Sequence, residues 1–201
     1  SAGDYLVRVN SGNQTINDDP YTIKVTTTEP FSNVEIESND SKNEATVLTN
    51  VTLTGQLSNS EDRDYYEFTT NGSGRINVTF DPTISSGYDY FTISILEPSN
   101  ATLSSFQTGK DGVFSAYVNS SGKYYILVQS TNRYDSDSYT ISAAFLSGSH
   151  NYETEGGINN DSWGNYSDNI VLGEMYTGQL YNSGDSDTFS FTIDQPGSID
   201  L

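Results

Sequence analysis

The sequence repeats itself, and this repeat limits what the chain can fold into more than any other feature does. "GDYLVRV" at 3–9 resembles "GKYYILV" at 122–128, and "PYTIKV" at 20–25 resembles "SYTISA" at 138–143. The separation is about 120 residues in both cases. The beginning of the chain therefore matches the end of a larger structural unit.

The end of the chain matches the front of the same unit. "TGQLSNSEDRDYYEF" at 54–68 returns as "TGQLYNSGDSDTFSF" at 177–191, and "GRINV" at 74–78 returns as "GSIDL" at 197–201. We therefore expect one complete copy with a partial copy on each side. The expected boundaries are 1–30 for the C-terminal part of a preceding repeat, 31–147 for the complete copy, and 148–201 for the N-terminal part of a following repeat.

Within the complete copy, apolar residues alternate with polar ones in short runs, separated by turn sequences such as "TNGSG" and "EPSN". The runs are Tyr66 and Phe68; Ile76, Val78 and Phe80; Phe91, Ile93 and Ile95; Phe114, Ala116 and Val118; Ile126 and Val128; Tyr139 and Ile141. About eight antiparallel strands must each bury one face, and two packed sheets achieve this. The sequence predicts an all-β chain of tandem jelly-roll-type β-sandwich domains, with a short helical turn at 41–48 capped by Ser41.

Composition excludes several classes of partner and site. The chain has 27 acidic residues against 8 basic ones, for a net charge of -19. Nucleic acid and anionic membrane surfaces are both negatively charged and would repel it. No window of about 18 apolar residues could insert into a membrane. The absence of Cys excludes disulfides and thiolate metal sites, so a different means of stabilising a small domain is expected.

The stretch "EIESND" places several oxygen-bearing side chains within a few residues. Carboxylates on alternate residues of an extended strand point to the same side, as Glu35 and Glu37 would. Asp62 and Asp64 repeat this spacing on a second segment. Calcium takes six to eight oxygen ligands, so such a cluster suits it. The alternative is a solvated acidic face; the recurrence of both halves in the second copy counts against that alternative.

The order of these motifs resembles the pre-peptidase C-terminal domain family, which includes the collagen-binding domains of clostridial collagenases. The matching pattern is Glu-x-Glu-x-Asn-Asp, then "TGQL", Asp-x-Asp-Tyr-Tyr-x-Phe, Gly-x-Tyr-Tyr-Ile-x-Val and finally Tyr-Thr-Ile. The resemblance implies a β-sandwich appended to secreted proteases and surface proteins, often in tandem, that in several members binds calcium.

The resemblance also implies a calcium ligand set in each copy. In the complete copy this set is Glu35, Glu37, Asn39, Asp40, Asp62 and Asp64; in the second it is Glu153, Glu155, Asn160, Asp161, Asp185 and Asp187. The second copy departs from the pattern, because "ETEGGINND" and "SWGNYSDN" lengthen the segment after its two glutamates.

Asn-X-Ser/Thr sequons occur nine times, against about five expected by chance from the Ser and Thr content. Their number indicates an extracellular glycoprotein, although a Ser- and Asn-rich surface also produces sequons by accident. Asn39 and Asn160 hold the same motif position, so we assign both to metal. The expected glycan acceptors are Asn13, Asn50, Asn71, Asn77, Asn100, Asn119 and Asn165.

Catalysis finds little support in the sequence. A hydrolytic triad needs a base beside its nucleophile, and the only His is His150, between two copies. Trp163 and the tyrosines could stack on sugars or a partner protein, but tyrosine in sheets more often packs within the core and across strands. Two function classes remain. One is a calcium-stabilised structural repeat of a cell-surface protein or filament, with other copies or neighbouring repeats as partners. The other is a protein- or polysaccharide-binding domain of a secreted protease.

Overall fold

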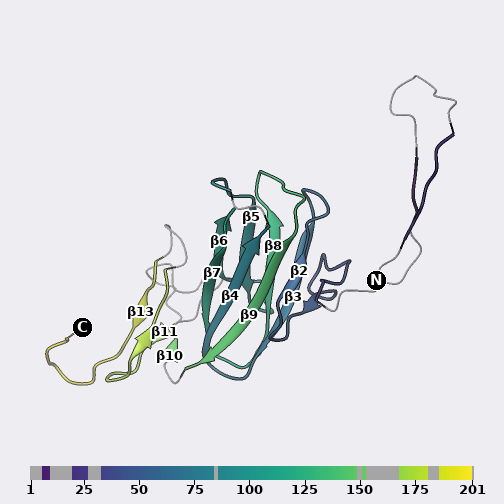
Figure 1. Ribbon diagram of the computed structural model, residues 1–201. Helices are drawn as coiled ribbons and strands as arrows, with labels where there is room; N and C mark the ends of the chain where they lie inside the picture. The colour runs from purple at the N-terminus through teal and green to yellow at the C-terminus, as the bar shows by residue number, and fades with distance from the viewer. Residues whose placement is uncertain are drawn as a thin grey trace.

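The alternating runs of the complete copy become the strands of a β-sandwich in the computed structural model, which describes residues 6–9, 20–26, 33–83, 86–148, 151–152, 168–180 and 186–200 (Figure 1). All regular elements of these residues are strands, as predicted. They are β1 (Thr46–Val47), β2 (Leu53–Gly55), β3 (Arg63–Thr70), β4 (Gly74–Pro82), β5 (Phe91–Leu96), β6 (Thr102–Thr108), β7 (Gly112–Val118), β8 (Gly122–Ser130), β9 (Tyr139–Ser147), β10 (Asn151–Tyr152), β11 (Asp168–Asn169), β12 (Tyr176–Thr177) and β13 (Phe189–Ser190). No helix in the described parts of the chain is long and apolar enough to cross a membrane.

Two sheets form the layers of the sandwich. One has the strand order β1-β3-β8-β5-β6 and the other β2-β9-β4-β7. Strands β2 to β9 pair antiparallel throughout, while β1 joins β3 in parallel. Without β1, the two sheets have the strand orders β3-β8-β5-β6 and β2-β9-β4-β7. These are the orders of an eight-stranded jelly roll. The predicted jelly-roll β-sandwich is confirmed; the tandem arrangement stays a prediction.

The core lies between the two sheets and consists of the predicted inward-facing residues. Ile76, Val78 and Phe80 of β4 are fully buried, as are Ile126 and Val128 of β8. Burying such side chains is the main source of stability in a small domain. Phe80, Phe91 and Tyr139 join the sheets through ring contacts, with centroids 5.0 to 5.7 Å apart.

Two parts of the sandwich differ from expectation. The hydrogen bond from Glu44 N to Ser41 O closes a turn, but no helix follows, because Thr46 then pairs with β3. The expected helical turn over 41–48 is therefore wrong beyond Glu44. Strand β6 was not predicted, because Leu103 and Ser104 are both buried and break the alternation.

The segment after the sandwich repeats a backbone pairing of the sandwich itself. In the sandwich, β1 pairs with β3 at Thr46 and Tyr66, and in the later segment β11 pairs with β13 at Asp168 and Phe189, also in parallel. By the sequence repeat, Phe189 is the equivalent of Tyr66. The hydrogen bond that follows the pair is also present in both places, from Leu48 N to Glu67 O at 2.9 Å and from Ile170 N to Ser190 O at 2.8 Å.

A second parallel pairing also recurs. Val34 bridges Thr54 at the entrance to the sandwich, and Tyr152 pairs with Thr177 in the later segment. Thr177 is the equivalent of Thr54 in "TGQL". The described strands after residue 150 therefore reproduce the local pairings of the front of the sandwich.

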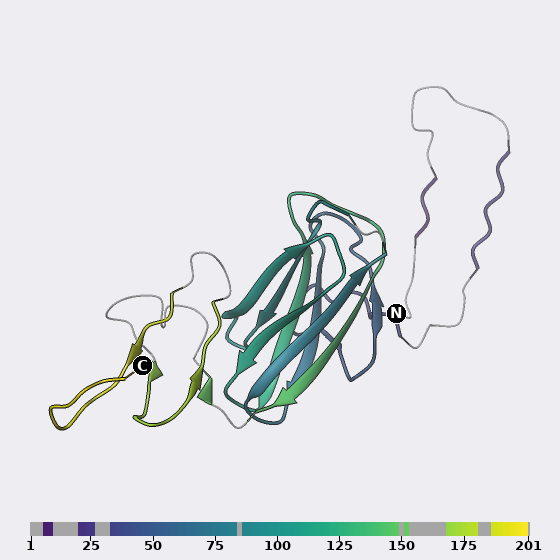
Figure 2. The ribbon, with the colours of Figure 1, turned by 60° about the vertical axis from the view of Figure 1, so that its left-hand side comes forward.

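The segments before and after the sandwich lie on opposite sides of it (Figures 1 and 2). Residues 6–9 and 20–26 run away from the sandwich, and their apolar side chains are exposed. Residues 168–180 and 186–200 lie beside the opposite edge, where the Gln179 side chain donates a hydrogen bond to the Ser115 carbonyl of β7.

Candidate metal site

The candidate site forms where the segment entering the sandwich passes beside β2. Glu35 N donates to Thr54 O at 3.0 Å, and Ile36 N donates to Thr46 Oγ1 at 3.0 Å. These bonds hold the segment extended, so Glu35 and Glu37 alternate with Ile36. Asp64 approaches from β3, whose side chains alternate between core and surface.

Three of the predicted ligands come together. One carboxylate oxygen from each of Glu35, Glu37 and Asp64 lies within 4.8 Å of the other two. Two ligands on opposite sides of a calcium ion, each at about 2.3 to 2.6 Å, would be separated by about 5 Å. The three oxygens are therefore spaced as ligands of one such ion would be.

Asn39 completes the group. Its side chain is fully buried, and its Nδ2 donates to Glu35 Oε2 at 3.3 Å. The Asn39 carbonyl accepts from Tyr65 N at 2.9 Å, which fixes the loop against β3. Asn39 Oδ1 and Asp64 Oδ1 are both buried and accept no hydrogen bond from the described residues. Unpartnered buried oxygens are costly, so a cation or a hydrogen-bond donor at this place would stabilise the fold.

The raised pKa values of the three carboxyl groups also favour a bound cation at this place. Burial, followed by the negative charge of Glu35, raises the pKa of Asp64 to about 8. Burial also raises the pKa of Glu35, and burial together with the charge of Glu35 raises that of Glu37. By itself the cluster is unfavourable in its charged form, which a cation would reverse.

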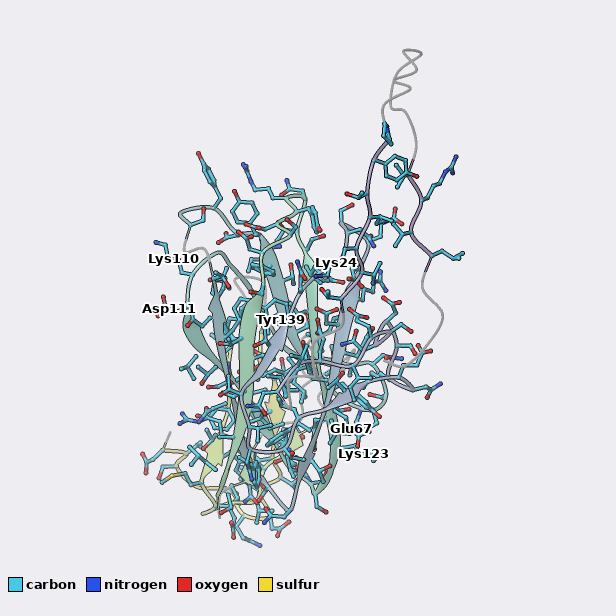
Figure 3. The ribbon with its side chains drawn as sticks, turned by 45° about the vertical axis from the view of Figure 1, so that its right-hand side comes forward. Lys24, Glu67, Lys110, Asp111, Lys123 and Tyr139 are labelled. Atoms are coloured by element: carbon cyan, nitrogen blue, oxygen red, sulfur yellow. The ribbon has the colours of Figure 1, made fainter. Side chains whose placement is uncertain are left out.

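Two tyrosines that we predicted only as core residues reach into the site. The Tyr139 hydroxyl donates to Asp64 Oδ2, the Tyr66 hydroxyl donates to Glu35 Oε2, and the two hydroxyls lie 2.8 Å apart. Figure 3 shows Tyr139 inside the sandwich. A Cβ at Gly55 would lie 2.4 Å from Tyr66 Oη and 2.5 Å from Tyr139 Cζ, so the glycine of "TGQL" makes room for this pair.

Asp40 and Asp62 form a second acidic pair beside the first group rather than joining it. A hydrogen bond with Asp62, followed by desolvation, raises the pKa of Asp40. Burial acts to raise the pKa of Asp62, but bonds from Ser58, Asp40 and Arg63 lower it overall. Asp62 lies just before β3 and accepts the backbone N–H groups of Ser58 and Arg63, which draws its carboxylate toward the turn.

The second ligand set is described only in part. Asp187 is half-buried and makes interactions with its surroundings. Glu153, Glu155, Asn160, Asp161 and Asp185 lie outside the described residues, as do His150 and Trp163.

The expected glycan acceptors differ in exposure. Asn50, Asn71, Asn100 and Asn119 are exposed. Asn77 is half-buried on the outer side of β4 and accepts a hydrogen bond from Ser115 Oγ at 2.8 Å. Asn13 and Asn165 lie outside the described residues. Full burial of Asn39 leaves it no room for a sugar, in keeping with its assignment to metal rather than glycan.

No protein-family model matches the sequence, and no curated protein matches it. Among solved structures, the chain is similar to the pre-peptidase C-terminal domain of a collagenase from Bacillus anthracis, with 18% identity over 59% of this chain and 100% of that one, at a TM-score of 0.38. A periplasmic g-type lysozyme inhibitor, PliG from Aeromonas hydrophila, has 16% identity over 48% of this chain and 85% of its own, at 0.38. The carbohydrate-binding module CBM36, solved with calcium and xylotriose, has 16% identity over 44% and 78%, at 0.26. At these identities the likeness concerns the fold alone.

Proposed function

We propose that this chain is a non-catalytic, calcium-stabilised and N-glycosylated repeat module of an extracellular surface protein or filament. The observation that carries the calcium part is the group formed by Glu35, Glu37, Asp64 and Asn39. Three carboxylates meet there, and two buried oxygens of the group, one on Asp64 and one on Asn39, accept no hydrogen bond from the described residues. Calcium prefers carboxylate and amide oxygens, and this group offers both.

Each residue has a separate part in holding the ion. Glu35 and Glu37 supply carboxylates from the entering segment, Asp64 supplies one from β3, and Asn39 supplies its free Oδ1. A bound calcium ion would offset two of the three negative charges of these carboxylates. It would also tie the entering segment to the sheet, so the ion acts as the staple that a chain without Cys needs.

Asn50, Asn71, Asn100 and Asn119 are exposed, as an attached sugar requires. Asn13, Asn77 and Asn165 belong to the same proposal on their sequons alone. Glycans at these positions would leave the core untouched. Loss of mass on deglycosylation of protein from its native source tests this part, and an unmodified polypeptide mass would contradict it.

A binding module of a secreted protease is the second candidate, and one observation favours it. A depression at the loop end of the sandwich is lined by Tyr88, Asp89, Gln107, Asn132 and Arg133, among others. The Arg133 guanidinium lies 4.5 Å from the centre of the Tyr88 ring. An aromatic ring beside several hydrogen-bonding groups is the kind of surface that takes a sugar or a peptide.

The decisive experiment is thermal unfolding of the chain in calcium and in chelator. Because the unfolded chain cannot assemble the site, calcium at a hundred times its Kd should add about 2.7 kcal/mol to the free energy of unfolding. Glu37→Gln and Asp64→Asn should lose most of the calcium-dependent rise in midpoint. Asp111→Asn, at the exposed turn before β7 (Figure 3), is the matched control and should keep it. Equal midpoints in calcium and chelator would reject the calcium site.

A further inference from the structure

The depression at the loop end of the sandwich is formed by three loops that leave one sheet side by side. Phe91, the first residue of β5, pairs with Thr108 at the end of β6 and with Ser130 at the end of β8. The loop before β5, the turn after β6 and the loop after β8 therefore start at neighbouring points. The depression has a volume of about 460 Å³, within the range of small-molecule sites. Its lining side chains are Tyr88, Asp89, Gln107, Thr131, Asn132 and Arg133.

Hydrogen bonds between the loops hold the depression in shape. Thr131 N donates to Tyr90 O at 2.9 Å, and Thr131 Oγ1 donates to Asp89 O at 2.8 Å, which ties the loop after β8 to the loop before β5. Tyr90 N donates to Thr108 O at 3.1 Å and ties the same loop to β6. Arg133 N donates to Thr131 Oγ1 at 3.1 Å. A lining whose backbone is already fixed loses less entropy when a ligand binds.

The Arg133 guanidinium lies over the ring of Tyr88, 4.5 Å from its centre. A guanidinium held in this way keeps its N–H groups for other partners, because the contact with the ring uses none of them. Among the described residues, no carboxylate forms an ion pair with Arg133. Tyr88 is itself 60% exposed, so part of its side chain remains open beside these donors.

The other lining side chains supply hydrogen-bonding groups of both kinds. Gln107 and Asn132 are exposed, and each amide contains a donor and an acceptor. Asp89 is also exposed and supplies a carboxylate, which accepts hydrogen bonds. A ligand at this place therefore meets donors and acceptors around one aromatic ring.

This chemistry favours one class of ligand over two others. None of the lining side chains is aliphatic, so an apolar residue of a peptide finds no pocket to fill. An acidic polysaccharide would be repelled by the carboxylate of Asp89 and by the net charge of -19. A neutral sugar meets neither obstacle, since its hydroxyls both donate and accept and its C–H groups pack against an aromatic ring.

We propose that this depression binds a neutral glycan. Tyr88 packs against the C–H groups of one sugar ring, and the Arg133 guanidinium donates to its hydroxyl oxygens. The side chains of Gln107, Asn132 and Asp89 form hydrogen bonds with the hydroxyls around the edge of the ring. The inference rests on the second candidate function, a binding module, and does not involve the calcium ligands.

The chemical shifts of the backbone amides test this inference on the full chain. Cellohexaose, xylohexaose and mannohexaose are the neutral probes, each at millimolar concentration. At least one should shift the amides of 87–89, 107 and 131–133, with a Kd on the order of 1 mM because the contact is small and open to solvent. Tyr88→Ala and Arg133→Ala should each weaken this binding at least about tenfold. Arg133→Lys should also weaken it, since lysine keeps the charge but loses the planar array of donors.

Lys42→Ala is the matched control. Lys42 also lies over a tyrosine ring, 4.7 Å from the centre of that of Tyr125, but it donates to the Glu97 carbonyl beyond the other end of β5. This variant should bind the probe as the unsubstituted chain does. Because Tyr88 and Arg133 are exposed, their variants should keep the melting midpoint of the unsubstituted chain, so a loss of binding reports on the depression and not on folding.

Two further probes separate this inference from the function on which it rests. If gelatin peptides shift the same amides and the neutral probes do not, the neutral glycan is rejected but the binding module is retained. Larger shifts with polygalacturonate than with any neutral probe would also reject the inference, in favour of an acidic glycan. No shift of these amides with any probe would reject both the inference and the binding function of the depression.

Discussion

The sandwich and the segment that follows it contain nearly the same sequence motifs, yet they bury them very differently. Leu57 and Ile76 are fully buried, whereas their equivalents Leu180 and Ile199 are 66% and 54% exposed. The parallel pairing of β1 with β3 is nevertheless reproduced by β11 and β13 in the same register. Short-range pairing therefore follows from the motif, whereas burial depends on strands distant in sequence.

The long-range strands explain this difference. In the sandwich, β9 pairs with both β2 and β4, and β8 pairs with both β3 and β5. Pairing either of these strands closes a loop of many residues and costs conformational entropy. Contacts in the complete core compensate for this cost. The described part of the following segment has the early strands alone, so its apolar residues have no opposite sheet to pack against.

Gly74 and its equivalent Gly197 give the sharpest test of this contrast, with the largest expected effect. A Cβ at Gly74 would lie 2.2 Å from the Leu146 carbonyl oxygen and 2.6 Å from Phe145 Cζ, whereas a Cβ at Gly197 would meet nothing within 4 Å. Gly74→Ala should therefore lower the free energy of unfolding of the sandwich by about 1 to 3 kcal/mol, as overpacking does. Gly197→Ala should leave it unchanged. Denaturant unfolding of the two variants measures this, and equal losses would mean that the two copies are packed alike.

Strands β3, β4, β5, β7, β8 and β9 could be predicted from the sequence because each contains a regular run of alternating apolar residues, whereas the short strands β1 and β2 contain no such run. Strand β6 escaped prediction because Leu103 and Ser104 are adjacent and both buried, and because β5 changes register between Ile95 and Leu96 where it pairs with β6. The need of each strand to bury one face predicted two packed sheets, whereas the order of the strands within them comes from the structure. The sequence repeat already indicated that the segment after residue 150 corresponds to the front of the sandwich, and the pairings of β10 with β12 and of β11 with β13 agree with it.

The acidic site could be predicted in part. Alternation correctly placed Glu35 and Glu37 on one side of an extended segment, and the structure brings Asp64 to them. The same rule suggested that Asp62 would accompany Asp64. Asp62 instead accepts backbone N–H groups of the turn before β3, a local hydrogen-bonding role that spacing does not show. The hydrogen bonds from the hydroxyls of Tyr66 and Tyr139 to the site were not predicted. A tyrosine in an alternating strand is expected to contribute its ring to the core, and the sequence does not show where its hydroxyl lies.

The smallest expected effect is a dependence of the melting temperature on pH. Replacing Asp64 should change this dependence, whereas replacing its equivalent Asp187 should not. Burial and the charge of Glu35 raise the pKa of Asp64 to about 8, so the folded chain holds this proton more tightly than the unfolded chain does. The stability that the proton contributes is complete below the carboxyl's ordinary pKa of about 3.9 and is lost as the pH rises through about 8. Metal-free protein should therefore melt at a lower temperature at pH 8 than at pH 5.

Calcium should oppose this trend, because its ligands bind in the deprotonated form and its affinity rises with pH. In saturating calcium, the fall in melting temperature between pH 5 and pH 8 should shrink or reverse. Asp64→Asn should weaken the dependence in metal-free protein, since the amide carries no titrating proton, whereas Asp187→Asn should retain it. Melting curves at the two pH values, with and without calcium, compare the three proteins.

A higher midpoint at pH 8 than at pH 5 in the metal-free chain would contradict the raised pKa of Asp64. Equal weakening by Asp64→Asn and Asp187→Asn would show that both copies of the motif are buried to the same degree in solution.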